Sequence, residues 1–297
     1  MVLSGCQSNE LASRPMSSTD ASDMPVVTVS SYPLYALTSE LAGNNATVVW
    51  PARESSSPRQ WTPDSDEIKR FQSSDLILLA GANYESWTHR VTLPRSRTYD
   101  VSAGYSEKLI ARDFAVDHQH GPNGSGAASE MAWGTWLNPE LCMMMLAEVT
   151  QQLCKVLPDN AASIQERSHT IHRQLDQVRG EMLKIASPKI GQFIALADGP
   201  GYEYLADRMR WEIHHMPALS DNASPEEKQV EWSTAIQKLK PQLIIYGRES
   251  DEISTAWVLR QSVPAARVDL CEFADASQSF TDRLMLNITN LKVALTP

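Results

Sequence analysis

The chain has 297 residues, of which 42% are hydrophobic and 21% are charged, as in ordinary folded globular proteins. Its formal net charge of −10 argues against a nucleic-acid partner, because binding phosphates requires a basic face. The sequence contains no run of 18 apolar residues and therefore predicts no membrane span. Nucleophile-elbow, phosphate-loop and His-Glu-x-x-His motifs are also absent from the sequence, so we expect a binding protein rather than an enzyme.

The first 24 residues predict a lipid anchor and a tether. Leu3-Ser-Gly-Cys6 has the form of a bacterial lipobox, in which the cysteine receives lipid, and residues 7–24 are polar and almost free of large apolar groups. A lipid on Cys6 would attach the protein to the membrane of a bacterial cell envelope, facing the periplasm or the exterior. The alternative is a chance match, since only five residues precede Cys6.

Alternating strands and helices follow the tether. Short β-branched or apolar runs predict strands, and capped amphipathic segments between them predict helices. Such alternation is typical of a parallel sheet covered on both faces. In chain order, the predicted elements are a strand at 26–30, a helix at 31–43 ending at Gly43, a strand at 46–50, a helix at 64–73 and a strand at 76–79.

The middle of the chain predicts an exposed loop and a connector. Residues 117–134 include a stretch rich in Gly and Ser. A helix at 139–157 follows, and then a helical stretch at 159–187 that would run roughly 40 Å. A helix of that length fits a connector between two lobes.

The strand-helix alternation then resumes up to the C-terminus. The predicted strands are at 193–197, 211–215, 243–246 and 266–270, and the predicted helices are at 202–209, 225–239, 253–261 and 280–295. We therefore predict an α/β protein of two lobes, each a mainly parallel sheet flanked by helices, joined by one long helix. The expected divisions are an N-terminal lobe at 25–158, the connector at 159–187 and a C-terminal lobe at 188–297.

Several motifs resemble those of one family. They are Trp61-Thr-Pro-Asp-Ser-Asp-Glu-Ile68, the segment from Ser74 to Trp87, Thr92-Leu-Pro94, His120-Gly-Pro-Asn-Gly124 and Thr135-Trp-Leu-Asn-Pro139. In this combination and spacing they resemble the solute-binding lipoproteins of zinc- and manganese-type ABC importers. The resemblance implies two α/β lobes, a zinc or manganese ion held between them by histidines and carboxylates, and delivery of the ion to a membrane permease and its ATPase. It also implies a monomer.

The family's ligand positions are altered in the first lobe. Where the resemblance implies a histidine after the proline of the first motif, this chain has Arg59, which stays protonated and cannot ligate a cation. Where it implies a histidine two residues before the Trp of the last motif, this chain has Gly134.

The second lobe is altered as well. Ala197 or Gly199 takes the place of the histidine that the resemblance implies after a strand, and Asp198 is the nearest possible ligand. Beyond Gly247, Glu249 would serve as the remaining carboxylate only if its loop shifted in register.

The candidate site follows from these positions. The candidate metal ligands are His118, His120, Asp198 and Glu249, and the candidate residues lining the cleft are Arg59, Trp61, Trp136, Tyr202 and Arg248. Each has a structural alternative. The two loop histidines can be solvated, Asp198 can cap a helix, and the tryptophans can be packing residues.

The expected function is that of a substrate-binding lipoprotein that captures a divalent cation between its lobes for an ABC importer. The alternative is a degenerate member that has lost metal binding in the cleft and binds another solute, or acts as a surface binding or adhesion module. Arg59 and Arg248 favour this alternative, because two cations near the cleft would repel a metal ion and attract an anion.

Overall fold

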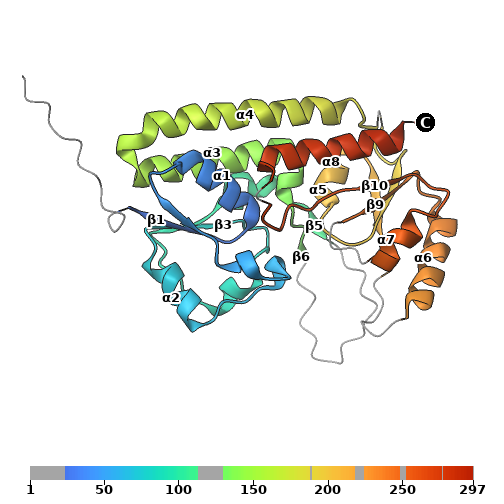
Figure 1. Ribbon diagram of the computed structural model, residues 1–297, viewed down its shortest axis with the longest axis horizontal. Helices are drawn as coiled ribbons and strands as arrows, with labels where there is room; N and C mark the ends of the chain where they lie inside the picture. Colours follow the sequence, from blue (N-terminus) through green and yellow to red (C-terminus); the bar gives the residue numbers. More distant parts are fainter. Residues whose placement is uncertain are drawn as a thin grey trace, which may run out of the picture.

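Two parallel β-sheets lie side by side and share a layer of helices on one side (Figure 1). A computed structural model describes residues 24–112, 130–187, 189–217, 224–247, 252–275 and 277–296. The two sheets confirm the predicted α/β class with two lobes. The exact divisions at residues 158 and 188 stay predictions.

The N-terminal sheet has the strand order β2-β1-β3-β4, with every neighbouring pair parallel. Its strands are β1 (Val26–Val29), β2 (Thr47–Val49), β3 (Leu76–Leu79) and β4 (Thr98–Asp100). Buried β-branched and leucine side chains explain β1 and β3, which lie in the middle of the sheet. Strand β4 was not predicted, because its three residues carry little apolar pattern.

The C-terminal sheet has the order β10-β9-β7-β8 and is also parallel throughout. Its strands are β7 (Ile194–Ala197), β8 (Glu212–His215), β9 (Leu243–Tyr246) and β10 (Ala265–Arg267). The strand predicted at 266–270 ends earlier, at Arg267. Beyond that residue, the carbonyls of Val268 and Leu270 accept hydrogen bonds from side chains instead of a neighbouring strand.

The helices match the predicted pattern closely. They are α1 (Tyr32–Ala42), α2 (Ser65–Ser73), α3 (Pro139–Val156), α4 (Ala161–Leu183), α5 (Glu203–Met209), α6 (Pro225–Leu239), α7 (Glu252–Val258) and α8 (Phe280–Leu295). Gly43 ends α1 with a positive φ of 58°, and Asp64 caps α2 in a capping box with Glu67. No helix within the described ranges combines the length and apolar character that a bilayer span requires.

Shorter segments complete the fold. The 3-10 segments are η2 (Pro51–Glu54), η3 (Pro58–Gln60), η4 (Ser86–Arg90), η5 (Val101–Lys108), η6 (Thr135–Leu137) and η7 (Pro158–Asn160). A two-stranded antiparallel ribbon pairs β5 (Ala111–Arg112) with β6 (Glu130–Met131).

Helix α4 runs along both lobes (Figure 1). Its apolar stripe is fully buried, and its members are Ile164, Ile171, Leu175, Val178 and Met182. Near its start, Arg167 Nε donates a 2.7 Å hydrogen bond to the carbonyl of Leu41 in α1. Near its end, Glu181 forms an ion pair with Lys292 of α8. The helix is therefore attached to elements of both lobes.

Truncating the buried stripe of α4 should destabilise the whole fold. Ile171 is 0% exposed, so Ile171→Ala should lower the free energy of unfolding by about 2–5 kcal/mol through lost burial and a cavity. His172 is exposed on the same helix, and His172→Ala should change it by less than about 0.5 kcal/mol. Urea denaturation followed by circular dichroism measures both, and equal effects would contradict the packing assigned to α4.

Candidate functional site

An aromatic cluster joins the two lobes. Tyr84, Trp133 and Trp136 pack with ring centroids 5.5–6.2 Å apart. All three are at most 4% exposed. Trp136 Nε1 donates a 2.7 Å hydrogen bond to the carbonyl of Leu270, which follows β10 in the other lobe. The lobes therefore meet through a buried contact with a directional hydrogen bond at its centre.

Next to this cluster the two backbones approach closely. Gly134 has φ +80°, and a Cβ atom there would lie 2.6 Å from the carbonyl oxygen of Gly201. Gly201 has φ +109°, and its own Cβ would lie 2.7 Å from the ring of Trp133. Neither position admits a side chain without movement. The place where the family resemblance implies a histidine is therefore filled by backbone from the opposite lobe.

A cavity of about 380 Å³ opens beside this contact. One of its lining residues, Trp133, comes from the N-terminal lobe, and the others come from the C-terminal lobe. Among the described residues, the lining comprises Trp133, Asp198, Gly199, Pro200, Tyr202, Lys228, Trp232, Ser254, Leu270 and Glu272. Asp198 follows β7 directly, so the cavity lies at the carboxyl ends of the parallel strands, where open α/β sheets bind ligands.

Two carboxylates of the cavity are fixed by hydrogen bonds. Asp198 Oδ2 accepts a 2.6 Å hydrogen bond from the backbone N–H of Gly247, which joins the ends of β7 and β9. Glu272 is 8% exposed and accepts a 3.1 Å hydrogen bond from the hydroxyl of Tyr84. Burial and the Glu272 carboxylate raise the pKa of Tyr84, so this hydroxyl stays protonated and donates.

Two of the indoles that line the cavity have buried ring nitrogens. Trp133 and Trp232 are 4% and 9% exposed. Their Nε1 atoms have no hydrogen-bond partner among the described residues. Each of these nitrogen atoms has less than 1 Å² of accessible surface, so the two indoles line the cavity with their apolar ring atoms. Trp232 is held by Trp257, with ring centroids 5.4 Å apart.

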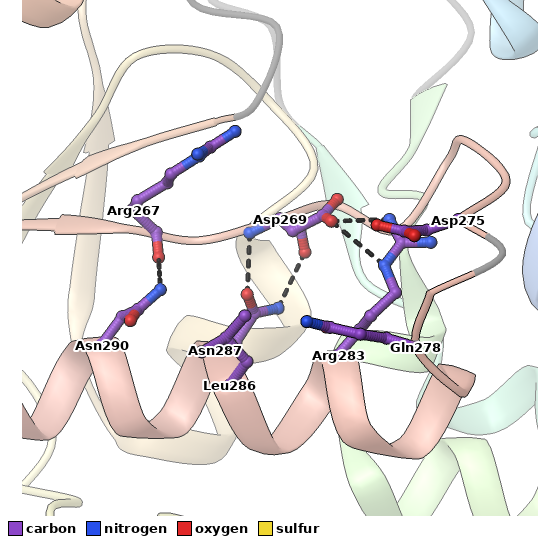
Figure 2. Close-up of a pocket in the computed structure, with 8 residues that line it drawn as sticks. All are labelled: Arg267, Asp269, Asp275, Gln278, Arg283, Leu286, Asn287 and Asn290. Atoms are coloured by element: carbon purple, nitrogen blue, oxygen red, sulfur yellow. Dashed lines mark hydrogen bonds and ion pairs between the residues drawn. The ribbon is translucent and has the colours of Figure 1, made fainter.

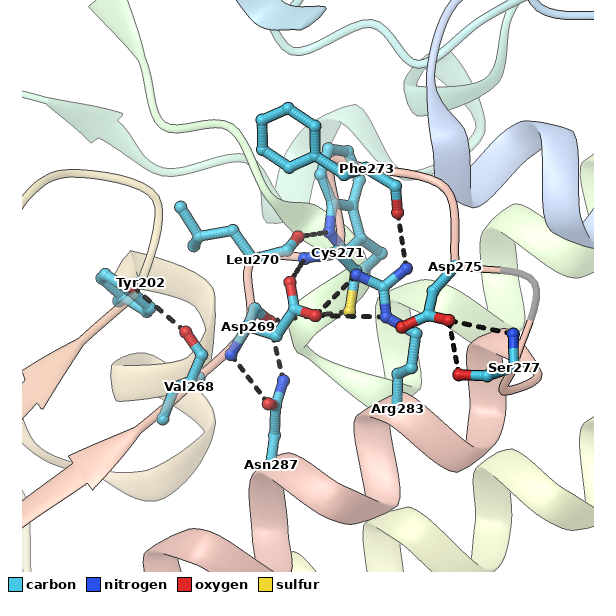
Figure 3. A network of polar contacts seen from close by, with 11 residues as sticks. Tyr202, Val268, Asp269, Leu270, Cys271, Phe273, Asp275, Ser277, Arg283 and Asn287 are labelled. Carbon is cyan, nitrogen blue, oxygen red and sulfur yellow. Dashed lines mark hydrogen bonds and ion pairs between the residues drawn. The ribbon is translucent and has the colours of Figure 1, made fainter. Parts of the chain in front are cut away.

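The segment that carries Leu270 and Glu272 is fixed by a polar network (Figure 3). Asp269 accepts hydrogen bonds from Arg283 Nε and Nη2 at 3.2 and 2.6 Å. Asn287 pairs with the backbone N–H and carbonyl of Asp269, at 2.8 Å each.

Arg283 extends this network to both lobes. Its Nη1 donates to the carbonyl of Phe273 at 2.6 Å. Its guanidinium also lies 4.8 Å from the ring centroid of Tyr32 in α1, a cation–π distance. Helix α8 therefore holds the chain on both sides of Glu272 and contacts the N-terminal lobe through the same side chain.

A second cavity, of about 290 Å³, lies against α8 (Figure 2). It is lined by Arg267, Asp269, Asp275, Gln278, Arg283, Leu286, Asn287 and Asn290. Its carboxylates are engaged within the protein, since Asp269 accepts from Arg283 and Asp275 accepts from Ser277. This cavity is lined by the network that supports the segment after β10, and it lies apart from the cavity between the lobes.

The predicted site residues fall in different places. Asp198 and Tyr202 line the cavity between the lobes. Trp136 lies in the neighbouring interlobe contact, and Arg59 lies 5.3 Å from the ring centroid of Trp133, outside the lining. Trp61 packs on Phe71 and Trp87 in a separate small core. Cys6, His118, His120, Arg248 and Glu249 lie outside the described residues.

Sequence reasoning predicted only Asp198 and Tyr202 among the lining residues, and those that it missed include Trp133, Lys228, Trp232 and Glu272. One signal was available for Glu272, because a carboxylate that soon follows a strand is the pattern that identified Asp198. Lys228 and Trp232 lie on α6, where nothing in the local pattern distinguishes them from surface and packing residues.

The described residues do not form a complete metal site. Among them, no group of three or more His, Cys, Asp or Glu side chains is placed to hold an ion. Zinc sites use three or four such ligands. His214 instead contacts Glu212 at 2.8 Å, and His215 lies 3.5 Å from Glu203. The cavity offers two carboxylates, together with the ammonium group of Lys228.

Two parallel-sheet lobes, a helix attached to both and a cavity between them define the class of solute-binding receptors. Within this class, the family described as "Zinc-uptake complex component A periplasmic" matches residues 27–294. The chain belongs to this family, whose members are receptors and not enzymes.

Known relatives are distant in sequence but close in fold. The zinc-binding lipoprotein AdcA of Streptococcus pneumoniae is 22% identical over 226 residues, which are 74% of this chain and 44% of the relative. Its Zn(II)-bound structure superposes with a TM-score of 0.72 at 15% identity, covering 91% of this chain and 57% of AdcA. The SBP FpvC of Pseudomonas aeruginosa, in complex with Ni²⁺, has a TM-score of 0.70 at 16% identity, covering 92% and 97%. The chain thus spans about half the length of its streptococcal relative, 44% in the sequence match and 57% in the structural match.

Glu85 is a buried carboxyl group beside Tyr84. It accepts hydrogen bonds from Ser30 Oγ and from the backbone N–H groups of Ala80 and Gly81. Burial raises its pKa from the ordinary 4.5 to about 7, against the lowering effect of these hydrogen bonds. Between pH 4.5 and about 7, the Glu85 carboxyl group is therefore protonated in the folded chain and ionised in the unfolded chain.

This proton makes stability depend on pH. The contribution of Glu85 to the free energy of unfolding should be fully present below pH 4.5, and up to about 3 kcal/mol of it should be lost as the pH rises from 4.5 through 7. Glu85→Gln should abolish most of this fall, whereas Glu107→Gln, at an exposed position, should keep it. Denaturation series across this pH range measure the slope. An unchanged slope in Glu85→Gln would show that another group is responsible.

The close approach of the Gly134 and Gly201 backbones predicts that a larger residue at position 134 destabilises the protein. Gly134→Ala should lower stability by about 1–3 kcal/mol, because alanine is strained at φ +80° and its Cβ meets Gly201. Gly199 has no atom within 4 Å of its Cβ position, so Gly199→Ala is the matched control and should be tolerated. Thermal unfolding compares the two variants, and equal midpoints would contradict the close approach.

Proposed function

We propose that this protein is the solute-binding receptor of an ABC importer and holds its solute in the cavity lined by Trp133, Asp198 and Glu272. The observation that carries the proposal is this cavity, which both lobes line at the carboxyl ends of the C-terminal strands, in a chain of the zinc-uptake family. Delivery to a permease and its ATPase, and anchoring through lipid on Cys6, complete the proposed role.

The first candidate cargo is a divalent cation, zinc or manganese. AdcA is named as zinc-binding, and its structure is Zn(II)-bound. Asp198 and Glu272 would give the cation oxygen contacts in the cavity. We propose His118, His120 and Glu249 as the further ligands, because the described residues alone supply too few donors.

The second candidate is a receptor that holds another solute in place of a bare ion. Lys228 lines the cavity and repels cations, and Gly134 leaves no room for a histidine. The adhesion role considered from the sequence has no comparable support in the described cavity.

Metal titration separates the candidates. We expect isothermal titration of Zn²⁺ into the full chain to show a dissociation constant of about 1 μM or lower. Asp198→Asn and the double variant His118→Ala/His120→Ala should each weaken binding by about tenfold or more, through loss of a ligand. Glu107→Gln is the control for removing one surface charge. No heat with Zn²⁺ or Mn²⁺ would exclude the cation and favour the second candidate.

A further inference from the structure

We propose that the loop at residues 81–85, here called the latch loop, is a proton-dependent connection between the lobes. While Glu85 is protonated, the loop holds Tyr84 against the C-terminal lobe, and ionisation of Glu85 favours an open loop that releases this contact. The backbone conformation of the loop, the buried position of Glu85 and the contacts of Tyr84 carry the inference, which holds whatever solute the protein binds.

The latch loop has a backbone conformation that is held from outside. Gly81, Ala82 and Asn83 follow one another with φ of +74°, +50° and +59°. Glycine and asparagine tolerate this left-handed region, whereas alanine is rarely found there. The conformation at Ala82 therefore depends on contacts that the loop makes with its surroundings.

The Glu85 carboxyl group supplies several of these contacts. It accepts hydrogen bonds from the backbone N–H groups of Ala80 and Gly81, at 2.7 and 3.1 Å, and from Ser30 Oγ. Ser30 follows β1 and Ala80 follows β3, the two inner strands of the N-terminal sheet. Glu85 is 5% exposed, so it positions the loop from inside the protein.

The residue before Glu85 reaches the other lobe. Tyr84 is 2% exposed, and its hydroxyl donates a 3.1 Å hydrogen bond to Glu272. Its ring packs on Trp133 and Trp136 in the interlobe cluster. Since the two residues are adjacent in the latch loop, a loop movement that exposes Glu85 to water also displaces Tyr84 from this contact.

Charged groups face the loop from both lobes. Burial raises the pKa of Glu85 to about 7, and the negative charge of Asp100 at the end of β4 adds to this effect. Around Tyr84, the charged groups are Glu272 and Arg59, which have opposite signs. Among the described residues, Asp100 is thus the charged group that acts on Glu85, and it disfavours ionisation.

Protons should favour the closed latch loop. Glu85 has a pKa of about 7 in the closed loop, and in an open, hydrated loop it would return to the ordinary 4.5. The closed state therefore binds the proton more tightly, and the ratio of open to closed loops should rise with pH and level off above about 7. These two pKa values give a rise of about 75-fold between pH 5 and pH 9.

The consequence for solute binding rests on the receptor function proposed above. Glu272 lines the cavity between the lobes, so release of Tyr84 removes one of the hydrogen bonds that position this carboxylate. The cavity would then be complete only while the latch loop is closed. The test below uses no ligand, so the latch can fail while the receptor function stands.

Hydrogen exchange tests the opening directly. It is followed by NMR on the full chain between pH 5 and pH 9, after correction for the intrinsic rates. We expect the protection of the Ala80 and Gly81 amides to fall by about 75-fold. The indole N–H of Trp136, which donates to the carbonyl of Leu270 across the interface, should lose protection in parallel.

The buried strand β9 is the internal reference. Its amides should exchange only through global unfolding, so the loop amides should be less protected than those of β9 at every pH. Equal protection in the loop and in β9 would show that Glu85 becomes exposed only when the protein unfolds, and it would overturn the proposal. Loss of protection in the loop without loss at Trp136 would overturn the connection between the lobes.

Removing the titrating group should remove the pH dependence. Glu85→Gln resembles the protonated acid in shape and charge, so loop and indole protection should change by less than about threefold over the same pH range. Glu107→Gln removes a charge at an exposed position and should keep the full fall. A fall that persists in Glu85→Gln would assign the effect to another group and reject the latch.

Two further variants should move the pH at which the fall levels off, in opposite directions. Ser30→Ala removes a donor that favours the ionised form of Glu85 and should move this pH up by about one unit. Asp100→Asn removes a charge that disfavours the ionised form and should move it down. A merely structural role would speed exchange at every pH without such shifts, so an unmoved levelling pH in both variants contradicts the proposal.

Discussion

The close packing of Trp133 and Gly134 against Gly201 determines how much space remains between the lobes. With backbone from one lobe against backbone from the other, this part of the interface has no room for a ligand or for a ligating side chain. The space that remains is displaced toward the C-terminal lobe, and Trp133 is the one residue of the described N-terminal lobe that lines it. A steric constraint at two glycines thus decides both the shape of the cavity and which lobe supplies its chemistry.

The elements behind this contact are tied together across the molecule. Arg283 on α8 pairs with Asp269 and lies over Tyr32 of the other lobe. The same helix is joined to α4 through Lys292 and Glu181. Such buried, multiply bonded networks specify one arrangement of their members when every group is satisfied. The position of Glu272 in the cavity is therefore set by contacts from both lobes, and not by the local conformation of its loop alone.

Local patterns in the sequence predicted most of the helices and strands. Apolar runs predicted the inner strands, a possible capping residue at Asp64 or Ser65 predicted the start of α2, and an apolar stripe predicted α4. The site was less predictable, because it depends on contacts between distant segments. Asp198 was found since it directly follows a strand. Glu272 was missed although it follows the predicted strand by two residues, and nothing near Trp133 signals that Gly201 lies against it.

A shared scaffold does not fix the cargo, because binding depends on the few side chains that line the site. In this cavity, carboxylates remain while no histidine of the described residues is among the lining. Carboxylates serve a metal ion and an ammonium group equally well as acceptors, so they do not discriminate between the two. Lys228 does discriminate, because its positive charge repels a metal ion. Lys228, which a zinc receptor would not need, is therefore the lining residue that says most about the solute.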